Sequence, residues 1–238
     1  MGIGAATCLR LAAEGARVAV CDFQLEPAKE VAGQIDGEAF DMDVTDSASV
    51  RAAADAIAES FGPPNIVVNN AGTDEFGFFH QTDEGLWNRI IDVNLLGVLR
   101  VTHAFLPAMI EGDGGRIVNV ASEAGRVGSN GSATYSAAKG GVISFTKAIA
   151  RENARFGITC NAVAPGPVNT PLLNRARELG QIGNKVIDTM VGSTALRRMA
   201  EPEEIANVVV FLAGDGASYV TATTIFADGG IMQSSPGL

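Results

Sequence analysis

Short apolar runs alternate with longer helical patterns along the whole chain, and this alternation constrains the fold more than any other feature. The runs are rich in β-branched residues and are separated by amphipathic segments; they lie near residues 17–22, 38–41, 66–69, 116–121, 159–164 and 223–227. Strands that alternate with helices are typical of a parallel sheet with helices on both faces. The sequence therefore predicts an α/β fold with a doubly wound, mostly parallel sheet.

The length and the net charge of the chain limit the number of domains and the kinds of partner that it can have. The 238 residues are 47% hydrophobic and contain no Pro/Ser-rich linker, so we expect one domain over residues 1–238. The formal net charge of −10 argues against a nucleic-acid surface, which needs a basic footprint. No stretch reaches the roughly 18 consecutive apolar residues of a membrane span, so no membrane partner is expected.

The cysteines and histidines do not indicate a metal or a disulfide framework. Cys8, Cys21 and Cys160 are odd in number and lack C-x-x-C spacing, which favours free thiols in a reducing, cytoplasmic environment. His80 and His103 have no carboxylate or cysteine at ligand spacing. We predict no metal site.

A hydroxyl, a phenol and an amine occur at a spacing that suits acid/base chemistry. Tyr135 and Lys139 are four residues apart, so a helix places them on one face. An ammonium group beside a phenol lowers the phenol's pKa from its usual value of about 10, which favours proton exchange near neutral pH. Ser122 follows a strand-like run and could hold the reacting oxygen. A lone Y-x-x-x-K pattern also occurs by chance on helix surfaces. Other motifs in the sequence are therefore needed before the pattern indicates a catalytic site.

Such motifs form an ordered set along the chain. Asn69-Asn70-Ala71-Gly72 follows an apolar run, Asp92-Val93-Asn94 lies in the next helix, and Pro165-Gly166 follows a later strand. With Ser122, Tyr135 and Lys139, and from Gly2 to the Asp228-Gly229-Gly230 run, the chain resembles the short-chain dehydrogenase/reductase family. The resemblance implies a Rossmann-like fold, a nicotinamide cofactor, and hydride transfer between a secondary alcohol and a ketone. It also implies a homotetramer and a catalytic tetrad of Asn94, Ser122, Tyr135 and Lys139.

The resemblance also implies a cofactor site, and one acidic residue favours NAD over NADP. Asp22 ends the strand-like run 17–22, where a carboxylate can accept hydrogen bonds from ribose hydroxyls and repel a 2′-phosphate. Gly2 and Gly4 precede a helical run whose first amides could meet a pyrophosphate. The full expected set is Gly2, Ile3, Gly4, Asp22, Phe23, Asp43, Val44, Asn70, Ala71, Gly72, Tyr135, Lys139, Pro165, Gly166, Val168 and Thr170.

The start of the chain departs from the family pattern. Family members open with a strand and a Thr-Gly-x-x-x-Gly-x-Gly turn, whereas this sequence begins Met1-Gly2-Ile3-Gly4 and keeps only the last two glycines. We expect the N-terminal strand to be absent and backbone groups in the sheet to be left unpaired. A wrongly assigned start or a truncated chain is the favoured explanation, and a natural variant with impaired cofactor binding is the alternative.

Substrate choice is expected in a lid over residues 166–200. Arg175, Arg177, Lys185, Arg197 and Arg198 give it a basic excess, which suits the phosphates of an acyl-CoA, although solvated helix charges explain it equally well. The segment 121–131 resembles hydroxyacyl-CoA members of the family, including those that oxidise a ring alcohol beside a thioester, of the 2-hydroxycyclohexanecarboxyl-CoA type. The alternative substrate is that of a 3-oxoacyl-carrier-protein reductase. Alternatives of another class are a non-catalytic dinucleotide-binding regulator and an inactive remnant.

Overall fold

The protein is described by a computed structural model that covers residues 2–175, 177 and 180–231. Its strands, all parallel to their neighbours, are β1 (Val18–Asp22), β2 (Gly37–Asp41), β3 (Ile66–Asn69), β4 (Gly115–Val120), β5 (Ile158–Pro165) and β6 (Thr224–Ala227). Each predicted strand is present to within one residue at either end. The α/β fold is confirmed.

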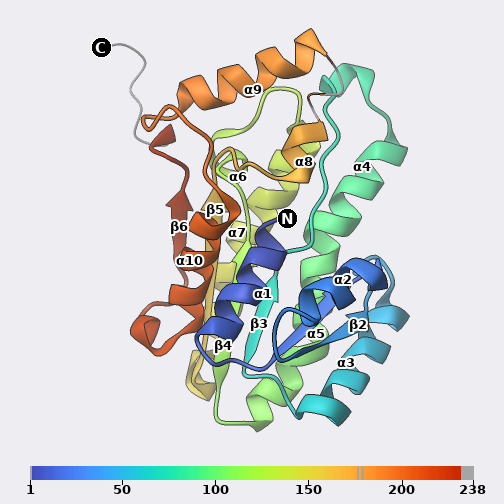
Figure 1. The fold of residues 1–238 in the computed structure, drawn as a ribbon, viewed down its shortest axis with the longest axis vertical. Helices are drawn as coiled ribbons and strands as arrows, with labels where there is room; N and C mark the ends of the chain where they lie inside the picture. The colour runs from blue at the N-terminus through green and yellow to red at the C-terminus, as the bar shows by residue number, and fades with distance from the viewer. Residues whose placement is uncertain (1, 176, 178–179, 232–238) are drawn as a thin grey trace.

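Helices cover both faces of the strands (Figure 1). On one face lie α1 (Ile3–Ala13), α2 (Leu25–Ala32) and α10 (Pro202–Ala213); on the other lie α3 (Ser47–Phe61), α5 (Gly97–Glu111) and α7 (Ala133–Asn153). The remaining α-helices are α4 (Glu84–Ile91), α6 (Ala124–Val127), α8 (Pro171–Asn174) and α9 (Gln181–Ser193). Both faces of the sheet are thus withdrawn from water, which explains why its strands read as continuous apolar runs.

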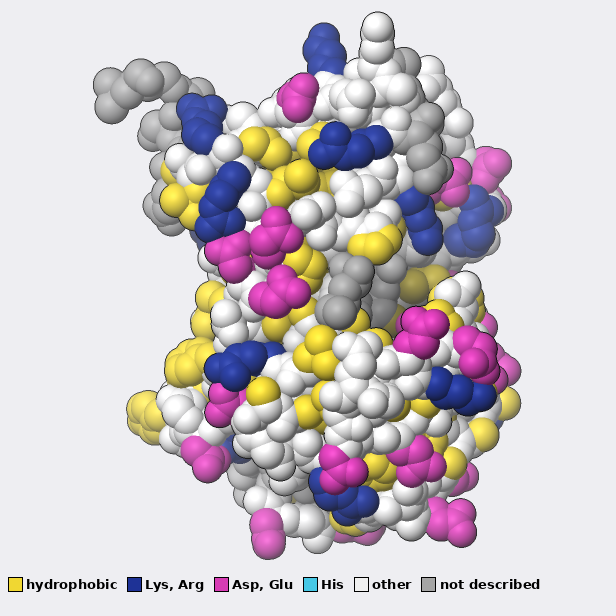
Figure 2. Space-filling model, in the orientation of Figure 1, with side chains coloured by type: hydrophobic (Ala, Val, Ile, Leu, Met, Phe, Trp, Pro, Cys, Tyr) yellow, Lys and Arg dark blue, Asp and Glu magenta, His cyan; other side chains and the backbone are white. Residues whose placement is uncertain are grey.

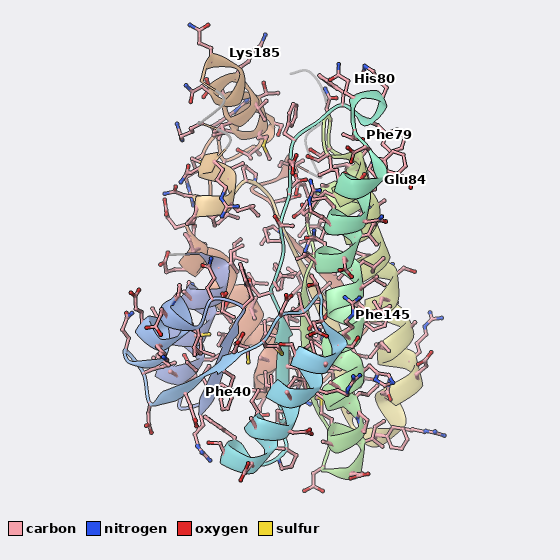
Figure 3. All side chains as sticks on the ribbon, turned by 90° about the vertical axis from the view of Figure 1, so that its right-hand side faces the viewer. Phe40, Phe79, His80, Glu84, Phe145 and Lys185 are labelled. Carbon is pink, nitrogen blue, oxygen red and sulfur yellow. The ribbon has the colours of Figure 1, made fainter. Side chains whose placement is uncertain are left out.

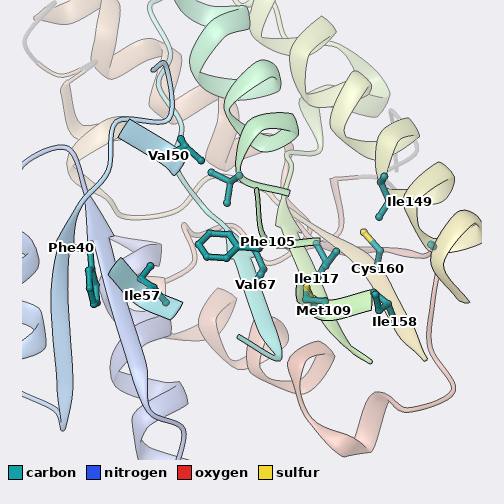
Figure 4. Close-up of a cluster of buried hydrophobic side chains, with 12 residues drawn as sticks. Phe40, Val50, Ile57, Val67, Phe105, Met109, Ile117, Ile149, Ile158 and Cys160 are labelled. Carbon is teal, nitrogen blue, oxygen red and sulfur yellow. The ribbon is translucent and has the colours of Figure 1, made fainter. Parts of the chain in front are cut away.

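The core divides along the pleat of β4. Ile117 packs with Val67, Phe105 and Met109 on the side of α5, in the cluster drawn in Figure 4. Val118, the next residue, packs on the side of α10. Successive strand residues point to opposite faces, so two neighbouring apolar residues serve two cores.

One helical stretch has an apolar composition over the length of a membrane span. Residues 84–111 form a continuous helix, and an 18-residue window in it is apolar enough to cross a membrane by length and composition alone, with a mean hydropathy of 1.5. The same stretch carries the buried residues Val98, Val101 and Phe105 and packs against β3, β4 and α3. Its hydrophobicity therefore serves the protein core.

The strands form two separate sheets. The order is β1-β2 in one and β3-β4-β5-β6 in the other, so within the described residues β1 and β3 each have a ladder partner on one side only. A cavity of about 3380 Å³ lies against every residue of both strands. Because no described strand lies between them, the expected gap in the sheet is present, and it opens into the site described next.

Candidate active site

Ser122, Tyr135 and Lys139 line one wall of the large cavity. Ser122 lies just beyond β4, while Tyr135 and Lys139 lie on successive turns of α7. The Lys139 Nζ atom lies 5.6 Å from the centroid of the Tyr135 ring and donates a 2.9 Å hydrogen bond to the carbonyl oxygen of Val120. The Ser122 hydroxyl lies next to the Tyr135 phenol, close enough to affect the pKa of that phenol. The packing of α7 beside β4 and β5 therefore brings these three groups together.

Asn94 lies behind this wall in a π-helical turn, Asp92–Leu96, that joins α4 to α5. Its Nδ2 donates to the carbonyl oxygens of Thr73, at 2.7 Å, and of Ile90, at 2.9 Å. A Cβ atom on Gly72 would lie 3.0 Å from Asn94 Oδ1 and 3.4 Å from Lys139 Nζ, so only glycine fits there comfortably. Asn94 thus ties the segment after β3 to this wall, and π turns are frequent at functional sites.

The electrostatics of the wall correct one expectation. Desolvation raises the pKa of Tyr135 above its ordinary value, the carboxylates of Asp74 and Glu123 add to the rise, and the hydrogen bond with Ser122 opposes it. Desolvation also lowers the pKa of Lys139 to about 8, against the attraction of Asp74. The expectation that Lys139 brings the Tyr135 pKa down is therefore wrong for this structure, because burial and two nearby carboxylates outweigh a cation that is itself desolvated.

The two carboxylates are functional candidates that the sequence reasoning missed. Asp74 Oδ2 accepts a 2.8 Å hydrogen bond from Ser132 Oγ, and Glu123 Oε2 accepts one of 2.6 Å from Ser122 Oγ. Burial raises the pKa of both carboxyl groups. The available signal was position, since Glu123 directly follows the candidate serine and Asp74 lies two residues after Gly72.

All sixteen residues expected to bind cofactor line the same cavity, from Gly2 at the start of α1 to Thr170 in the lid. At Gly4 a Cβ atom would lie 2.5 Å from Asn70 Nδ2, so the absent side chain allows α1 to meet the segment after β3. Asp22 is exposed at the end of β1, where its Oδ1 accepts a 2.9 Å bond from the Gln24 amide.

Other members of the cofactor set are also held in place. Asp43 Oδ1 accepts hydrogen bonds from the amide and the hydroxyl of Thr45, at 2.8 and 2.7 Å, and these bonds hold the pKa of Asp43 below its usual range. An open helix start at Gly2, an acidic strand end and close glycine contacts are three of the elements that dinucleotide sites use. The residues therefore fit such a cofactor.

The segment expected to form the lid follows the carboxyl end of β5, and its residues 176, 178 and 179 lie outside the described part of the chain. A Cβ atom on Gly166 would lie 2.8 Å from the Cα of Asp228, so the chain leaves β5 through a close backbone crossing. Thr170 caps α8 by accepting a 3.3 Å bond from the Leu173 amide. In Figure 3, Lys185 on α9 lies at the same end of the molecule as Phe79 and His80, which precede α4.

The basic residues of the lid divide into two groups. Arg175 and Lys185 line the cavity. Arg177 Nε donates to Asn174 Oδ1, Arg197 donates to the Gly192 carbonyl, and Arg198 pairs with Glu204 at 2.6 Å. On the face shown in Figure 2, acidic and basic side chains are interspersed around the apolar patches. Two cations of the five are thus placed to meet a ligand in the cavity.

Comparison with known proteins agrees with this geometry. A family profile described as enoyl-(acyl carrier protein) reductase matches residues 1–232. The (3R)-3-hydroxyacyl-CoA dehydrogenase of Canis lupus familiaris is 36% identical over 97% of this chain and 92% of its own length. For the 3-oxoacyl-[acyl-carrier-protein] reductase of Thermotoga maritima the identity is 37%, over 97% of this chain and 94% of that protein.

Among solved structures, levodione reductase superposes with a TM-score of 0.91 at 35% identity, covering 98% of this chain and 95% of the other. The matches extend over nearly the whole chain, and the relatives named are oxidoreductases. The chain is accordingly an enzyme that acts on CH–OH groups with a nicotinamide dinucleotide. It belongs to the short-chain dehydrogenase/reductase family.

Proposed function

We propose that this enzyme uses NAD to interconvert a secondary alcohol and a ketone on a hydroxyacyl-CoA-type substrate, including one whose alcohol lies on a ring. The observation that carries the proposal is the shared cavity, since Ser122, Tyr135 and Lys139 line it together with the cofactor set. The similar (3R)-3-hydroxyacyl-CoA dehydrogenase supports the substrate class. Arg175 and Lys185 supply cations on the lid side for the phosphates of such a substrate.

The nicotinamide group, when bound, gives or takes the hydride. In the proposed reduction, Tyr135 donates its phenolic proton to the substrate oxygen while Ser122 orients that oxygen by a hydrogen bond. Because the pKa of Tyr135 is raised, the phenol is protonated at neutral pH and ready to act as an acid. Oxidation needs the phenolate, so its rate should increase toward alkaline pH. Lys139, anchored on the Val120 carbonyl, holds its ammonium beside the phenol.

Cofactor choice rests on Asp22. Its carboxylate lies at the end of β1 on the cavity, where it can accept hydrogen bonds from two ribose hydroxyls. A 2′-phosphate at the same place would meet a like charge. This arrangement supports NAD as the cofactor.

A second candidate substrate is a 3-oxoacyl group on a carrier protein, supported by the relative from Thermotoga maritima. Docking of an acidic carrier needs free basic residues near the entrance. Arg116, near the end of β4 opposite Ser122, does not serve this need, since it is half-buried, donates to the Gly115 carbonyl and lies 4.0 Å from Asp215. The net charge of −10 also opposes an acidic partner, which favours the free thioester.

We also propose that the enzyme is a cytoplasmic homotetramer. The family resemblance supports assembly through α5 and α7. Three free cysteines, none of them in a disulfide, suit a reducing compartment. Light scattering on the purified protein tests the assembly.

Tyr135→Phe tests the proposed chemistry. We expect turnover to fall by about 10²-fold to 10⁴-fold, because the proton donor is lost while the ring still packs. Binding of NADH should stay within about twofold, measured by calorimetric titration. The assay follows NADH absorbance with hydroxyacyl-CoA, acyl-carrier and free cyclic alcohols. The matched control is Tyr219→Phe, since Tyr219 is the other tyrosine and is fully exposed.

Two outcomes contradict the proposal. Near-normal turnover by Tyr135→Phe would remove the assigned acid. Binding of NADH by the unmodified protein without turnover of any substrate in the panel would instead support the non-catalytic regulator.

A further inference from the structure

The Ser122 hydroxyl already forms hydrogen bonds to its neighbours in the chain, and these bonds limit what it can offer a substrate. A hydroxyl has one proton to donate and two lone pairs to accept with. In this structure the proton points to Glu123 Oε2 at 2.6 Å, and one lone pair accepts the Ala124 amide at 3.2 Å. The other lone pair faces the cavity, where the Tyr135 phenol is its neighbour. In this state Ser122 can accept a hydrogen bond from a ligand but has no proton to give.

A ketone and an alcohol differ in the hydrogen bonds that they can form with the Ser122 hydroxyl. A ketone oxygen is an acceptor only, so it gains nothing from a serine whose proton is already in use. An alcohol brings its own O–H and can donate to the remaining lone pair in place of the Tyr135 phenol. If the Glu123 carboxyl carries a proton, that proton can be donated to Ser122, and the serine hydroxyl is released to donate to a ketone.

The surroundings of Glu123 favour such a protonation change. The side chain is 8% exposed, and the described residues give it no ion pair. Asp228, beyond β6, raises its pKa further, while the hydrogen bond from Ser122 lowers it. Tyr135 faces it from α7, and Arg126 on α6 lies with its guanidinium 5.1 Å over the Phe226 ring.

We propose that Glu123 is a positioning residue that sets whether Ser122 donates to or accepts from the substrate oxygen. Ionised Glu123 keeps Ser122 an acceptor, which suits an alcohol, and protonated Glu123 frees it as a donor, which suits a ketone. This inference rests on the proposed role of Ser122 in the reaction. Its consequence is that ketone affinity decreases as the pH increases through the titration of Glu123, whereas alcohol affinity does not.

The experiment measures KM and kcat for the ketone and the alcohol against pH in the unmodified enzyme and in Glu123→Gln. The glutamine keeps the shape and carries an N–H donor at every pH. We expect its ketone KM to become independent of pH over that range and, at the high-pH end, to lie about tenfold below that of the unmodified enzyme. Tyr135 should still titrate in kcat. Glu59→Gln, an exposed change on α3 away from the cavity, should reproduce the unmodified profile.

A second measurement needs no turnover. In protein labelled with ¹³C at the glutamate carboxyls, the Glu123 resonance is the one that Glu123→Gln removes. In the unmodified protein the hydrogen bond from Ser122 stabilises the ionised carboxylate of Glu123. Ser122→Ala removes that bond, so the Glu123 titration should move to higher pH. An unmoved titration, or a pH-dependent ketone KM that persists in Glu123→Gln, would overturn the inference. Absence of turnover on every substrate, with the resonance shifted as expected, would count against the proposed function and leave the Ser122–Glu123 coupling in place.

Discussion

Single side chains control the chemistry of this cleft by their distance from charges and from water. Glu123 and Asp74 place two carboxyl groups near the Tyr135 phenol, and both raise the pKa of that phenol. Lys139 is the nearby cation. It is only 2% exposed, and burial lowers its pKa to about 8, which disfavours its charged form. The raised pKa therefore favours the protonated phenol, which is the form that the proposed ketone reduction uses.

Asp22 carries a prediction at the same scale. Asp22→Ala should reduce the preference for NAD over NADP by at least about tenfold, or about 1.4 kcal/mol, because the like charge facing a 2′-phosphate is removed. The ratio of kcat/KM with the two cofactors measures the effect. Asp36→Ala, at an exposed site outside the cavity, is the control. Equal use of both cofactors by the unmodified enzyme would show that Asp22 does not discriminate.

Between elements, buried amides join the strands that carry the site. Asn69 Nδ2 on β3 donates to Asn119 Oδ1 on β4 at 2.8 Å, and Asn119 Nδ2 donates to Thr146 Oγ1 on α7 at 2.9 Å. Asn69 Nδ2 also lies 3.1 Å from Thr102 Oγ1 on α5. Since all four side chains are buried, every bond in the chain replaces a bond to water. This network aligns the ends of β3 and β4, where Gly72 and Ser122 follow.

Asn119→Ala should reduce the free energy of unfolding by about 2 to 4 kcal/mol, because it removes the buried hydrogen bonds to Asn69 and Thr146 and opens a small void. Denaturant unfolding measures the loss. Turnover should also fall, since the strand ends would no longer be held in register. Asn88→Ala, on the exposed side of α4, should change stability by no more than about 0.5 kcal/mol. A comparable loss in both variants would contradict a special role for the network.

Across the whole molecule, the unusual feature is the slot between the two sheets. β1 and β3 face it with backbone groups that no described strand pairs, and α1, α5 and α10 also line it. The end of the slot next to Gly4 and Asn70 adjoins the start of α1. An extended segment entering there could hydrogen-bond to both strands and join the sheets.

Fusing five β-branched residues and a glycine turn ahead of Gly2 should therefore increase the free energy of unfolding by about 3 kcal/mol or more, given about 0.5 to 1.5 kcal/mol for each new hydrogen bond. Hydrogen exchange should show new protection at amides of β1 and β3. A fusion with proline at alternate positions, which cannot donate to a ladder, is the control. Equal stability of both fusions would show that the slot does not accept a strand.

Much of the fold could be predicted because it depends on local patterns. The strand at 66–69 has the predicted bounds, and the strand at 116–121 is displaced by one residue, since β-branched runs between helical segments need no long-range information. The spacing of Tyr135 and Lys139 fixed their shared helix face in the same way. The partners of these residues depend on distant segments. Asp74 approaches Ser132, 58 residues away, and no sequence period encodes that contact.

By itself, the sequence determined the order of strands and helices and the family, and it proposed the reacting groups, because all three depend on residue type and spacing along the chain. Only the tertiary structure decided the charge state that those groups prefer. Burial and the approach of Asp74 and Glu123 raise the pKa of Tyr135 where spacing alone predicted a lower one. Desolvation depends on what covers a side chain from every direction, and that is a property of the folded chain.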